Sequence, residues 1–460
     1  MGDRSSLVRP RKVTGSGEGL VSRAGLVVLD EMASVTGLID GFRDVFAGWP
    51  SRRLDPGDGY GQVVIALADG ATALSDVTGL GRSGLFTQTG SNTTRWEWFD
   101  RIAADELAGI RRARAAARAQ AWDRGAGPSG STLIVDLDAT IITGTDTKED
   151  SAGTWKGTWG HHPLLAIAAE SGEILGGLLR PGNAGSNTAV DHVQLLGEVI
   201  DDLPEPWQVG HRPCDGETPE RTIVVRADSA GFSHWLIEAC DDRNLEFSIG
   251  HPVTQAIRDA LLLVQEEHWT PARNTNRTRR SGAFVAELTH LVDTPGRARM
   301  IVRRERPHPG AQLNLFDDIN GWRHQVFITN SAGKPAGLER RHRQRGTAEA
   351  VIRDLKATGA NNLPFSGVVA NQAWLLAAMS ALDLLAWTRA IALPNSMARA
   401  TPKTLRYRIL HVAGRLTPTG RDLHLDTHWP WTRVTLRALQ RIRTAFQPPT
   451  VTTALTATPT

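Results

Sequence analysis

The pattern of short β-branched runs and amphipathic stretches in residues 131–250 constrains the fold more than any other feature. Apolar and polar residues alternate in STLIVDLDATII, as in a strand with one buried face, and RTIVVRADSAG is a buried strand followed by a polar turn. Two more strands with a turn at ESGE lie between these runs, and NTAVDHVQLLGEVIDDL and FSHWLIEACDDR have helical spacing. The resulting order of strand, strand, strand, helix, strand, helix, strand predicts a mixed α/β sheet.

The sequence on either side of residues 131–250 differs in composition and in the periodicity of its apolar residues. Residues 1–24 are rich in Gly, Ser and Arg, and residues 25–125 have mostly helical spacing. Residues 251–330 contain short β-like runs separated by Pro, Gly and Asn, and helical spacing resumes near residue 337. We therefore expect a helical part, an α/β core interrupted by a mostly β insertion, and further helices.

Charge is distributed unevenly although the formal net charge is only +3. Residues 131–330 hold 18 Lys and Arg against 28 Asp and Glu, whereas residues 331–460 hold 18 against 6. A basic block of this kind indicates a polyanionic partner, and the alternative is a basic surface without a partner.

Cysteine and apolar content exclude several classes of protein. Two cysteines, Cys214 and Cys240, are too few for a disulfide framework or a C-x-x-C zinc module, so a reduced, cytosolic protein is expected. The most apolar run, residues 368–387, contains Asn371, Gln372 and Asp383, which favours a buried helix over a membrane span.

Two aspartates follow predicted strands, where open α/β sheets place their chemistry. Asp138 lies near the end of the first strand, and Asp228 comes directly after VVRA. Each could instead cap the turn that follows it. Asp136 competes with Asp138 for the same role, because residues two apart on a strand point to the same face.

A third acid stands in RRHRQRGTAEAVIRDLK, residues 340–356, which we predict to be one helix. The steps between His342, Arg345, Glu349, Arg353 and Lys356 place all five on one helical stripe. A carboxylate among cations stays ionised and suits a metal ligand, while Arg and Lys suit phosphates. The alternative is an exposed salt-bridged face.

Carboxylate ligands without cysteine favour Mg²⁺ or Mn²⁺. Two such ions can bracket an in-line attack on a phosphodiester. His161 and His162 form another candidate pair, but adjacent strand residues face opposite sides, so a structural role is expected for them.

Together these residues resemble the DDE transposases of bacterial insertion sequences, in the group with a Y-x2-R-x3-E-x6-K signature and a β-rich insertion. The signature here is His342-x2-Arg345-x3-Glu349-x6-Lys356, with histidine in place of tyrosine. The segments DLDAT, RADSAG and GGLLRPGNAGSN also resemble this group, over about residues 130–390.

The resemblance implies an RNase H-like core in which Asp138, Asp228 and Glu349 bind two divalent ions. It implies that Arg345 and Lys356 hold DNA near the transposon end, and we expect Arg353 and His342 beside them. Relatives stack an insertion-domain aromatic on a flipped base, a role for which Trp269 and Trp322 are candidates. Burial of both tryptophans in the core is the alternative.

These inferences predict a division of the chain into six segments. They are a flexible segment (1–24), a helical DNA-binding domain (25–130), the first part of the core (131–250), the β-rich insertion (251–335), the last core helices (336–390) and a basic C-terminal region (391–460).

The expected activity is cutting at transposon ends and joining of the 3′-hydroxyl ends to target DNA, with a hairpin intermediate as one route. The expected partners are double-stranded DNA and a second copy of the chain on paired ends, and the expected location is the bacterial nucleoid in the cytoplasm, not a membrane. A purely hydrolytic nuclease and a non-catalytic DNA-binding protein are the alternatives.

Overall fold

The computed structural model describes residues 17–447, except 52, 82, 83, 87, 186, 187, 214–216, 308–317, 320 and 421. Residues 1–16 of the predicted flexible segment and Cys214 lie outside the described residues. Cys240, the other cysteine, is buried and free.

Five strands form the core sheet in the order β9-β8-β2-β6-β7. Strands β2, β8 and β9 are parallel, whereas β6 and β7 are antiparallel additions beside β2. Helices α7 and α8 provide the two crossovers between the parallel strands. The mixed α/β class is confirmed, and the strand order and directions are those of an RNase H-like core. The bounds are β2 Thr132–Ala139, β6 Leu164–Ala168, β7 Ile174–Leu178, α7 Ala189–Asp201, β8 Thr222–Ala227, α8 His234–Asp242 and β9 Glu246–His251.

The β-rich stretch that follows extends the same sheet. Strand β14 pairs antiparallel with β9, and the sheet continues in the order β14-β12-β11-β10, with β13 on β14. The segment also contains helix α9, which the β-like pattern did not predict. Thr254 caps this helix, and its buried residues Ile257, Ala260 and Leu261 have helical spacing. The bounds are α9 Gln255–Leu263, β10 Thr270–Arg273, β11 Arg279–Glu287, β12 Arg299–Glu305, β13 Asp318–Ile319 and β14 Trp322–Thr329.

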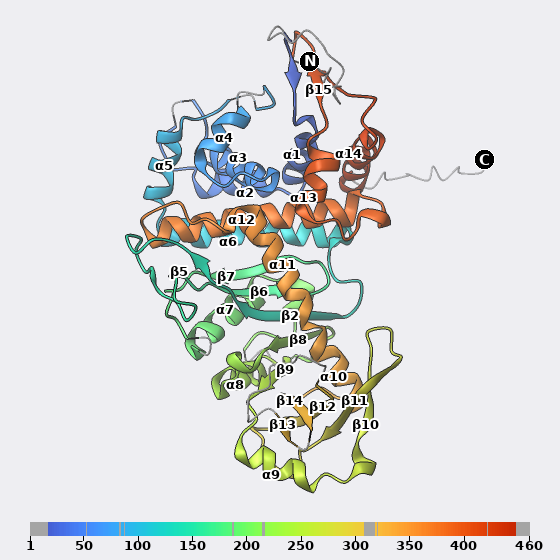
Figure 1. Cartoon of the computed structure of the whole chain (residues 1–460). Coiled ribbons are helices and arrows are strands. Elements are labelled where there is room, and N and C mark those ends of the chain that lie inside the picture. Colours follow the sequence, from blue (N-terminus) through green and yellow to red (C-terminus); the bar gives the residue numbers. More distant parts are fainter. Residues whose placement is uncertain are drawn as a thin grey trace, which may run out of the picture.

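Helices from both ends of the chain cover one face of the core. Helix α6 and helix α12 lie side by side across the middle of the molecule, with α1 to α5 packed beyond them (Figure 1). Helix α12 is long and apolar enough to cross a membrane, but 83% of its most apolar window is buried inside the protein, so the predicted buried helix is confirmed. The bounds are α1 Val27–Val35, α2 Leu38–Val45, α3 Pro56–Asp69, α4 Leu74–Gly81, α5 Asn92–Arg101, α6 Ala104–Ala121 and α12 Val368–Trp387.

The C-terminal residues combine helices with two short strands. Strand β15 pairs with β16 on one side and on the other with β1, close to the N-terminus, so the two ends of the described chain share a small sheet. Three further short strands form the sheet β3-β5-β4 beside the core. The bounds are β1 Leu20–Val21, β3 Ile142–Thr143, β4 Ala152–Gly153, β5 Trp159–His161, α13 Pro402–Leu405, β15 Gly414–Leu416, β16 Leu423–Leu425 and α14 Thr432–Phe446.

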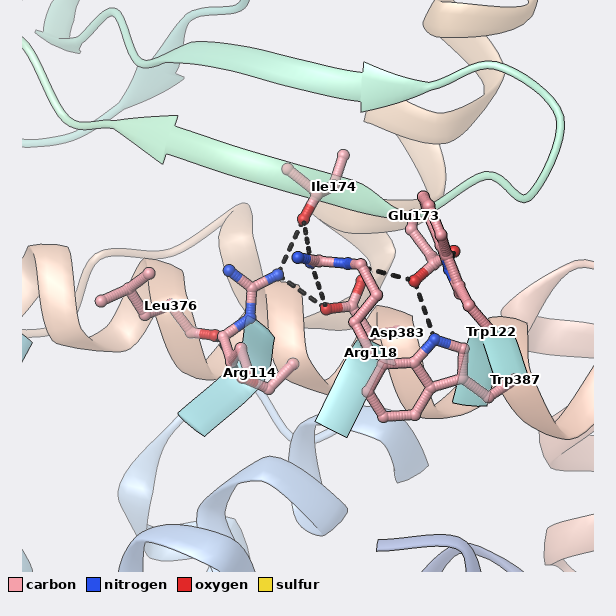
Figure 2. A network of polar contacts seen from close by, with 9 residues as sticks. Arg114, Arg118, Trp122, Glu173, Ile174, Leu376, Asp383 and Trp387 are labelled. Atoms are coloured by element: carbon pink, nitrogen blue, oxygen red, sulfur yellow. Dashed lines mark hydrogen bonds and ion pairs between the residues drawn. The ribbon is translucent and has the colours of Figure 1, made fainter. Parts of the chain in front are cut away.

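A buried charged network joins α6 to α12 and to the start of β7 (Figure 2). Arg114 is 2.7 Å from Asp383 and donates to the carbonyl of Ile174, and both charged side chains are at most 1% exposed. Arg118 contacts Glu173, whose Oε1 also accepts a hydrogen bond from the Trp387 indole. Because buried charges are costly unless they are paired, this network favours one packing of the two helices.

The prediction that residues 340–356 form one helix is wrong. Helix α10 (Pro335–Arg343) ends in a 3₁₀ turn, Gln344–Gly346, before α11 (Thr347–Leu355) begins. The Thr347 hydroxyl donates to the carbonyl of Gln344, a local bond that competes with regular helix. Because of this break, His342 lies in α10 and Glu349 lies in α11, so the two residues do not share one face of a single helix as predicted.

Candidate active site

Adjacent parallel strands bring Asp138 and Asp228 to one end of the sheet. Asp138 is the penultimate residue of β2, and Asp228 directly follows β8, the parallel neighbour of β2. Arg345 lies between the two carboxylates: its guanidinium is 3.2 Å from Asp138 and 3.8 Å from Asp228. Residues 90 positions apart in the sequence thus face one cation from the α10–α11 junction.

The two carboxylates have different surroundings. The Asp138 side chain is 19% exposed, and its burial raises the pKa of the carboxyl, while Arg345 opposes this and Asp228 adds to it. Asp228 is 51% exposed, and its Oδ1 accepts hydrogen bonds from the backbone N–H groups of Ala230 and Gly231. Asp228 therefore caps the turn after β8 with one oxygen and leaves Oδ2 toward Arg345.

Asp136, the competing acid, is fully buried and already paired. Both of its oxygens accept from Arg226, at 2.6 and 2.7 Å, and Arg226 also donates to the carbonyl of Arg341. Burial raises the pKa of Asp136, and the hydrogen bond from Arg226 opposes that rise. With both oxygens occupied, Asp136 holds β2 against β8, and Asp138 is the acid with access to the cavity.

Asp138 and Asp228 line a cavity of about 500 Å³ that contains two histidines and an exposed tryptophan. His162 and His192 each donate from Nδ1 to a backbone carbonyl, at 3.1 and 3.0 Å, so the lone pair of each neutral ring is on Nε2. Burial lowers the pKa of both rings. The cavity is lined by Leu137, Asp138, Ala139, Trp155, His162, Leu164, Gly182, Asn183, Ala184, Gly185, His192, Asp228 and Ala230.

Two of these cavity residues, Trp155 and His192, were not predicted from the sequence, and His162 was predicted to have only a structural role. His161, its neighbour, points the other way and contacts the carbonyl of Glu149. The expected separation of these two rings is therefore observed. His192 comes from the middle of an amphipathic helix, and no motif marks it.

Glu349 is not brought together with the two aspartates. It is exposed in the first turn of α11 and does not line the cavity. Within the described ranges, no group of three Asp, Glu, His or Cys side chains is arranged to hold a metal ion. The donor types still fit a hard divalent ion, since Asp138 and Asp228 offer carboxylate oxygens into an open cavity.

The other residues of the predicted stripe have diverse contacts. Lys356 donates from Nζ to the carbonyl of Ile141 at 2.7 Å, and burial lowers its pKa, with an added effect from Lys156. The Arg353 side chain is 68% exposed beside Asp354. His342 stacks on Phe327 at 4.3 Å and contacts the Ser248 hydroxyl, and its pKa is lowered to about 3, mainly by burial.

Arginines cover the two tryptophans that were predicted to stack on a base. The Arg304 guanidinium lies 4.2 Å from the ring centroid of Trp269 and 4.7 Å from that of Trp322, and Arg306 lies 4.2 Å from Trp322. Trp269 is buried, at 8% exposure, whereas Trp322 is half-buried. The stacking role remains a prediction that this arrangement does not favour.

Comparison with known proteins identifies a family, and solved structures that are similar include one transposase complex. The cryo-EM structure of the piggyBac transposase synaptic complex with hairpin DNA is similar, with a TM-score of 0.43 and 9% identity, and the match covers 93% of this chain and 83% of that chain. No curated protein sequence matches. The family model described as "Transposase DDE domain group 1" matches residues 6–447, almost the whole sequence. The chain therefore belongs to the group 1 DDE-domain transposase family.

Proposed function

We propose that this protein binds the ends of its own DNA element, cuts the DNA there and joins the 3′-hydroxyl ends to target DNA at the cavity between β2 and β8. The observation that carries the proposal is the pair of carboxylates, Asp138 and Asp228, at the ends of parallel neighbouring strands in one open cavity. Membership of a transposase family already implies DNA cleavage and strand transfer in general terms.

The proposed chemistry consists of two displacements at phosphorus. In cleavage, a water oxygen bonds to the scissile phosphorus and loses a proton to solvent, while the bond to the 3′-oxygen breaks and that oxygen takes up a proton to become a hydroxyl. In joining, the freed 3′-hydroxyl attacks a target phosphodiester and displaces the target strand's own 3′-oxygen. In the hairpin route, that hydroxyl first attacks the opposite strand of the same end and displaces the 3′-oxygen of the flanking DNA, and a second water then opens the hairpin and frees the 3′-hydroxyl for joining.

Transposases of this family generally use divalent metal ions. Asp138 and Asp228 would hold Mg²⁺ or Mn²⁺, and Glu349, one helical turn after Arg345, is proposed as the third carboxylate. Such ions, when bound, polarise the phosphate and stabilise both the entering and leaving oxygens.

The protein's own residues supply positioning and charge around this centre. Arg345 reaches both aspartates, so the same guanidinium can turn to a phosphate oxygen once the carboxylates have another partner. Lys356 anchors the end of α11 to the chain after β2 through the carbonyl of Ile141. His162 and His192 offer Nε2 acceptors to a nucleophile in the cavity.

DNA contacts beyond the cavity belong to the same proposal. We assign end recognition to the helical residues 25–130 and to the basic residues 391–460, and we propose that two copies act on paired ends. Action on DNA would place the protein at the nucleoid of a bacterial cytoplasm.

The test uses purified protein and a duplex containing the DNA that flanks the gene, with Mg²⁺ or Mn²⁺. We expect nicks at the element ends, joined products with a target plasmid, and loss of both when the ions are chelated. Hairpin-ended fragments on a denaturing gel would identify the hairpin route. Cleavage without any joined product would instead support a hydrolytic nuclease, and binding without either reaction would support a non-catalytic protein.

A further inference from the structure

The hairpin that joins β10 to β11 is strongly cationic within an acidic part of the chain. Four arginines lie between residues 273 and 280, and no Asp or Glu occurs from residue 268 to residue 286. Residues 131–330 as a whole hold ten more acidic than basic residues. The arginines of this hairpin are therefore a local concentration of positive charge that the composition of the region does not explain.

Three of these arginine side chains point to solvent. Arg273, Arg277 and Arg279 are exposed, and none of them forms an ion pair with a carboxylate in the described part of the chain. Arg280 differs, because it pairs with Glu305 at 2.7 Å. Like charges held close together repel one another. The tip of this hairpin, residues 273–280, is therefore stabilised when a polyanion binds it.

The turn holds its shape through its own hydrogen bonds. The N–H of Asn274 donates to the carbonyl of Thr278 at 2.8 Å, and the Asn276 carboxamide accepts from both the N–H and the hydroxyl of Thr278. Arg277 has a φ of 68°, in the left-handed region that favours Gly or Asn. A residue held in a costly backbone conformation suggests a use for its side chain, which here is the exposed guanidinium of Arg277.

The hairpin is fixed to the helix that leads to the candidate active site. Arg343, the last residue of α10, donates to the carbonyl of Arg273, and α10 packs along β10 and β11 (Figure 1). Two residues further on, Arg345 contacts Asp138 and Asp228. Arg343 and Arg345, which are two positions apart in the chain, thus contact the tip and the carboxylates, respectively.

A second cavity connects the tip with this junction. It has a volume of about 1000 Å³, and its lining includes Thr275 of the tip, Gly346 and Thr347 of the junction, and Arg343, Arg389 and Arg399. Among the described residues, the lining holds one carboxylate, Glu170, against four arginines, of which Arg226 and Arg343 are paired with Asp136 and Glu339, so the cavity wall is more basic than acidic.

We propose that the β10–β11 tip binds the phosphate backbone of the same DNA duplex whose scissile phosphate lies at Asp138 and Asp228. This inference rests on the proposed function. Arg277 and Arg279 contact phosphate oxygens, while the cationic cavity accommodates the backbone between the tip and the α10–α11 junction. Contacts of this kind set the register of the duplex and carry no sequence information.

The test measures how duplex binding depends on salt, in EDTA so that no cleavage occurs. A fluorescent duplex from the DNA that flanks the gene is titrated with the full chain at several salt concentrations. For the double variant Arg277→Ala/Arg279→Ala, we expect the slope of log K against log salt to decrease in magnitude by up to about 1.8, or about 0.9 per phosphate contact. The double variant Arg277→Lys/Arg279→Lys should keep the wild-type slope.

The control is Arg212→Ala/Arg297→Ala, in which Arg212, unlike Arg277 and Arg279, pairs with a carboxylate, Glu205, at 2.7 Å. Both control arginines are exposed, and Arg297 lies beyond the opposite end of β11. An unchanged slope in the tip variant, an equal decrease in the control, or a decrease that lysine does not prevent would each overturn the inference. Absence of cleavage by the wild type in Mg²⁺ would count against the proposed function and leave this binding measurement intact.

Discussion

At the scale of single residues, two aspartates on strand β2 have different surroundings. Asp136 and Asp138 lie two positions apart on β2, and the sequence pattern predicted Asp138 as the ligand with Asp136 as its rival. Arg226 reaches one of them and satisfies both of its oxygens, while the other opens to the cavity. The partner on a neighbouring strand, not the residue type, separates a structural acid from a candidate catalytic one.

Asparagine at Asp138 or at Asp228 should reduce cleavage and joining by at least about 100-fold without loss of duplex binding, because charge stabilisation at the reacting phosphate is lost. Rates are measured on a nicking gel, and binding is measured by anisotropy in EDTA. Asp136→Asn is the informative comparison, since it breaks a buried ion pair and should lower the free energy of unfolding by about 3–5 kcal/mol. If the Asp138 variant kept full activity and only the Asp136 variant lost it, the assignment of the first acid would be wrong.

Replacement of His342 by tyrosine should flatten the dependence of stability on pH. The ring has a pKa of about 3 in the fold, below the ordinary value of 6.5. The neutral ring therefore contributes stability above pH 6.5, and this contribution is lost as the pH falls from 6.5 toward 3. Urea midpoints over this range should fall less steeply for His342→Tyr than for wild type.

The control for this effect is His428→Tyr, because the His428 side chain is 96% exposed. A wild-type slope in the His342 variant, or an equal change in the His428 variant, would contradict the role of burial at His342.

At the scale of elements, the turn between α10 and α11 positions Arg345, and the paired helices α6 and α12 support the sheet that carries the site. The 3₁₀ turn at Gln344–Gly346 brings Arg345 to the aspartates, whereas an unbroken helix was predicted. Behind the sheet, the network of Arg114, Arg118, Glu173 and Asp383 joins α6 to α12 (Figure 2). The N-terminal helices are thereby attached to the core through charge as well as apolar contact.

Alanine at Asp383 should lower the free energy of unfolding by about 3–5 kcal/mol, because Arg114 would be left buried without its carboxylate. The combined variant Arg114→Met/Asp383→Leu removes both charges and should recover most of that loss. Urea unfolding of the single and double variants measures this coupling. Additive losses in the double variant would show that the two side chains do not act as a pair.

At the scale of the whole molecule, segments distant in the sequence share one apolar core. Helix α12 is surrounded by N-terminal helices and by the C-terminal region, and α14 packs on α1, where Arg443 pairs with Glu31 at 2.9 Å. The predicted boundaries near residues 130 and 390 divide the sequence by composition, but this core extends across both positions. The boundaries themselves remain predictions.

Removal of residues 402–460 should expose the apolar side of α1 and α12 and destabilise the N-terminal helices as well. We expect limited proteolysis to cut the truncated chain within residues 27–121, which the full chain protects, and its thermal midpoint to decrease. A truncated chain with the protease pattern and midpoint of the full chain would show that the C-terminal region folds separately.

Local patterns allowed much of the fold to be predicted, because strand and helix periodicities depend only on nearby residues. The order of core elements and the buried nature of residues 368–387 followed from such patterns. Helix α9 and the strands at residues 414–425 were missed, since short elements in mixed sequence have weak periodicity. No motif or spacing in the sequence marks the cavity residues Trp155 and His192.

Residue types and their spacing along the chain were sufficient to predict the mixed α/β class, the family signature and the position of Asp138 and Asp228 at strand ends. Contacts between distant segments, which spacing along the chain does not reveal, are what pair Asp136 with Arg226 and place Arg345 against both Asp138 and Asp228. These outcomes depend on which side chains from distant segments the fold places within reach of one another. Burial makes the pairing of Asp136 with Arg226 exclusive, because a buried charge needs a partner.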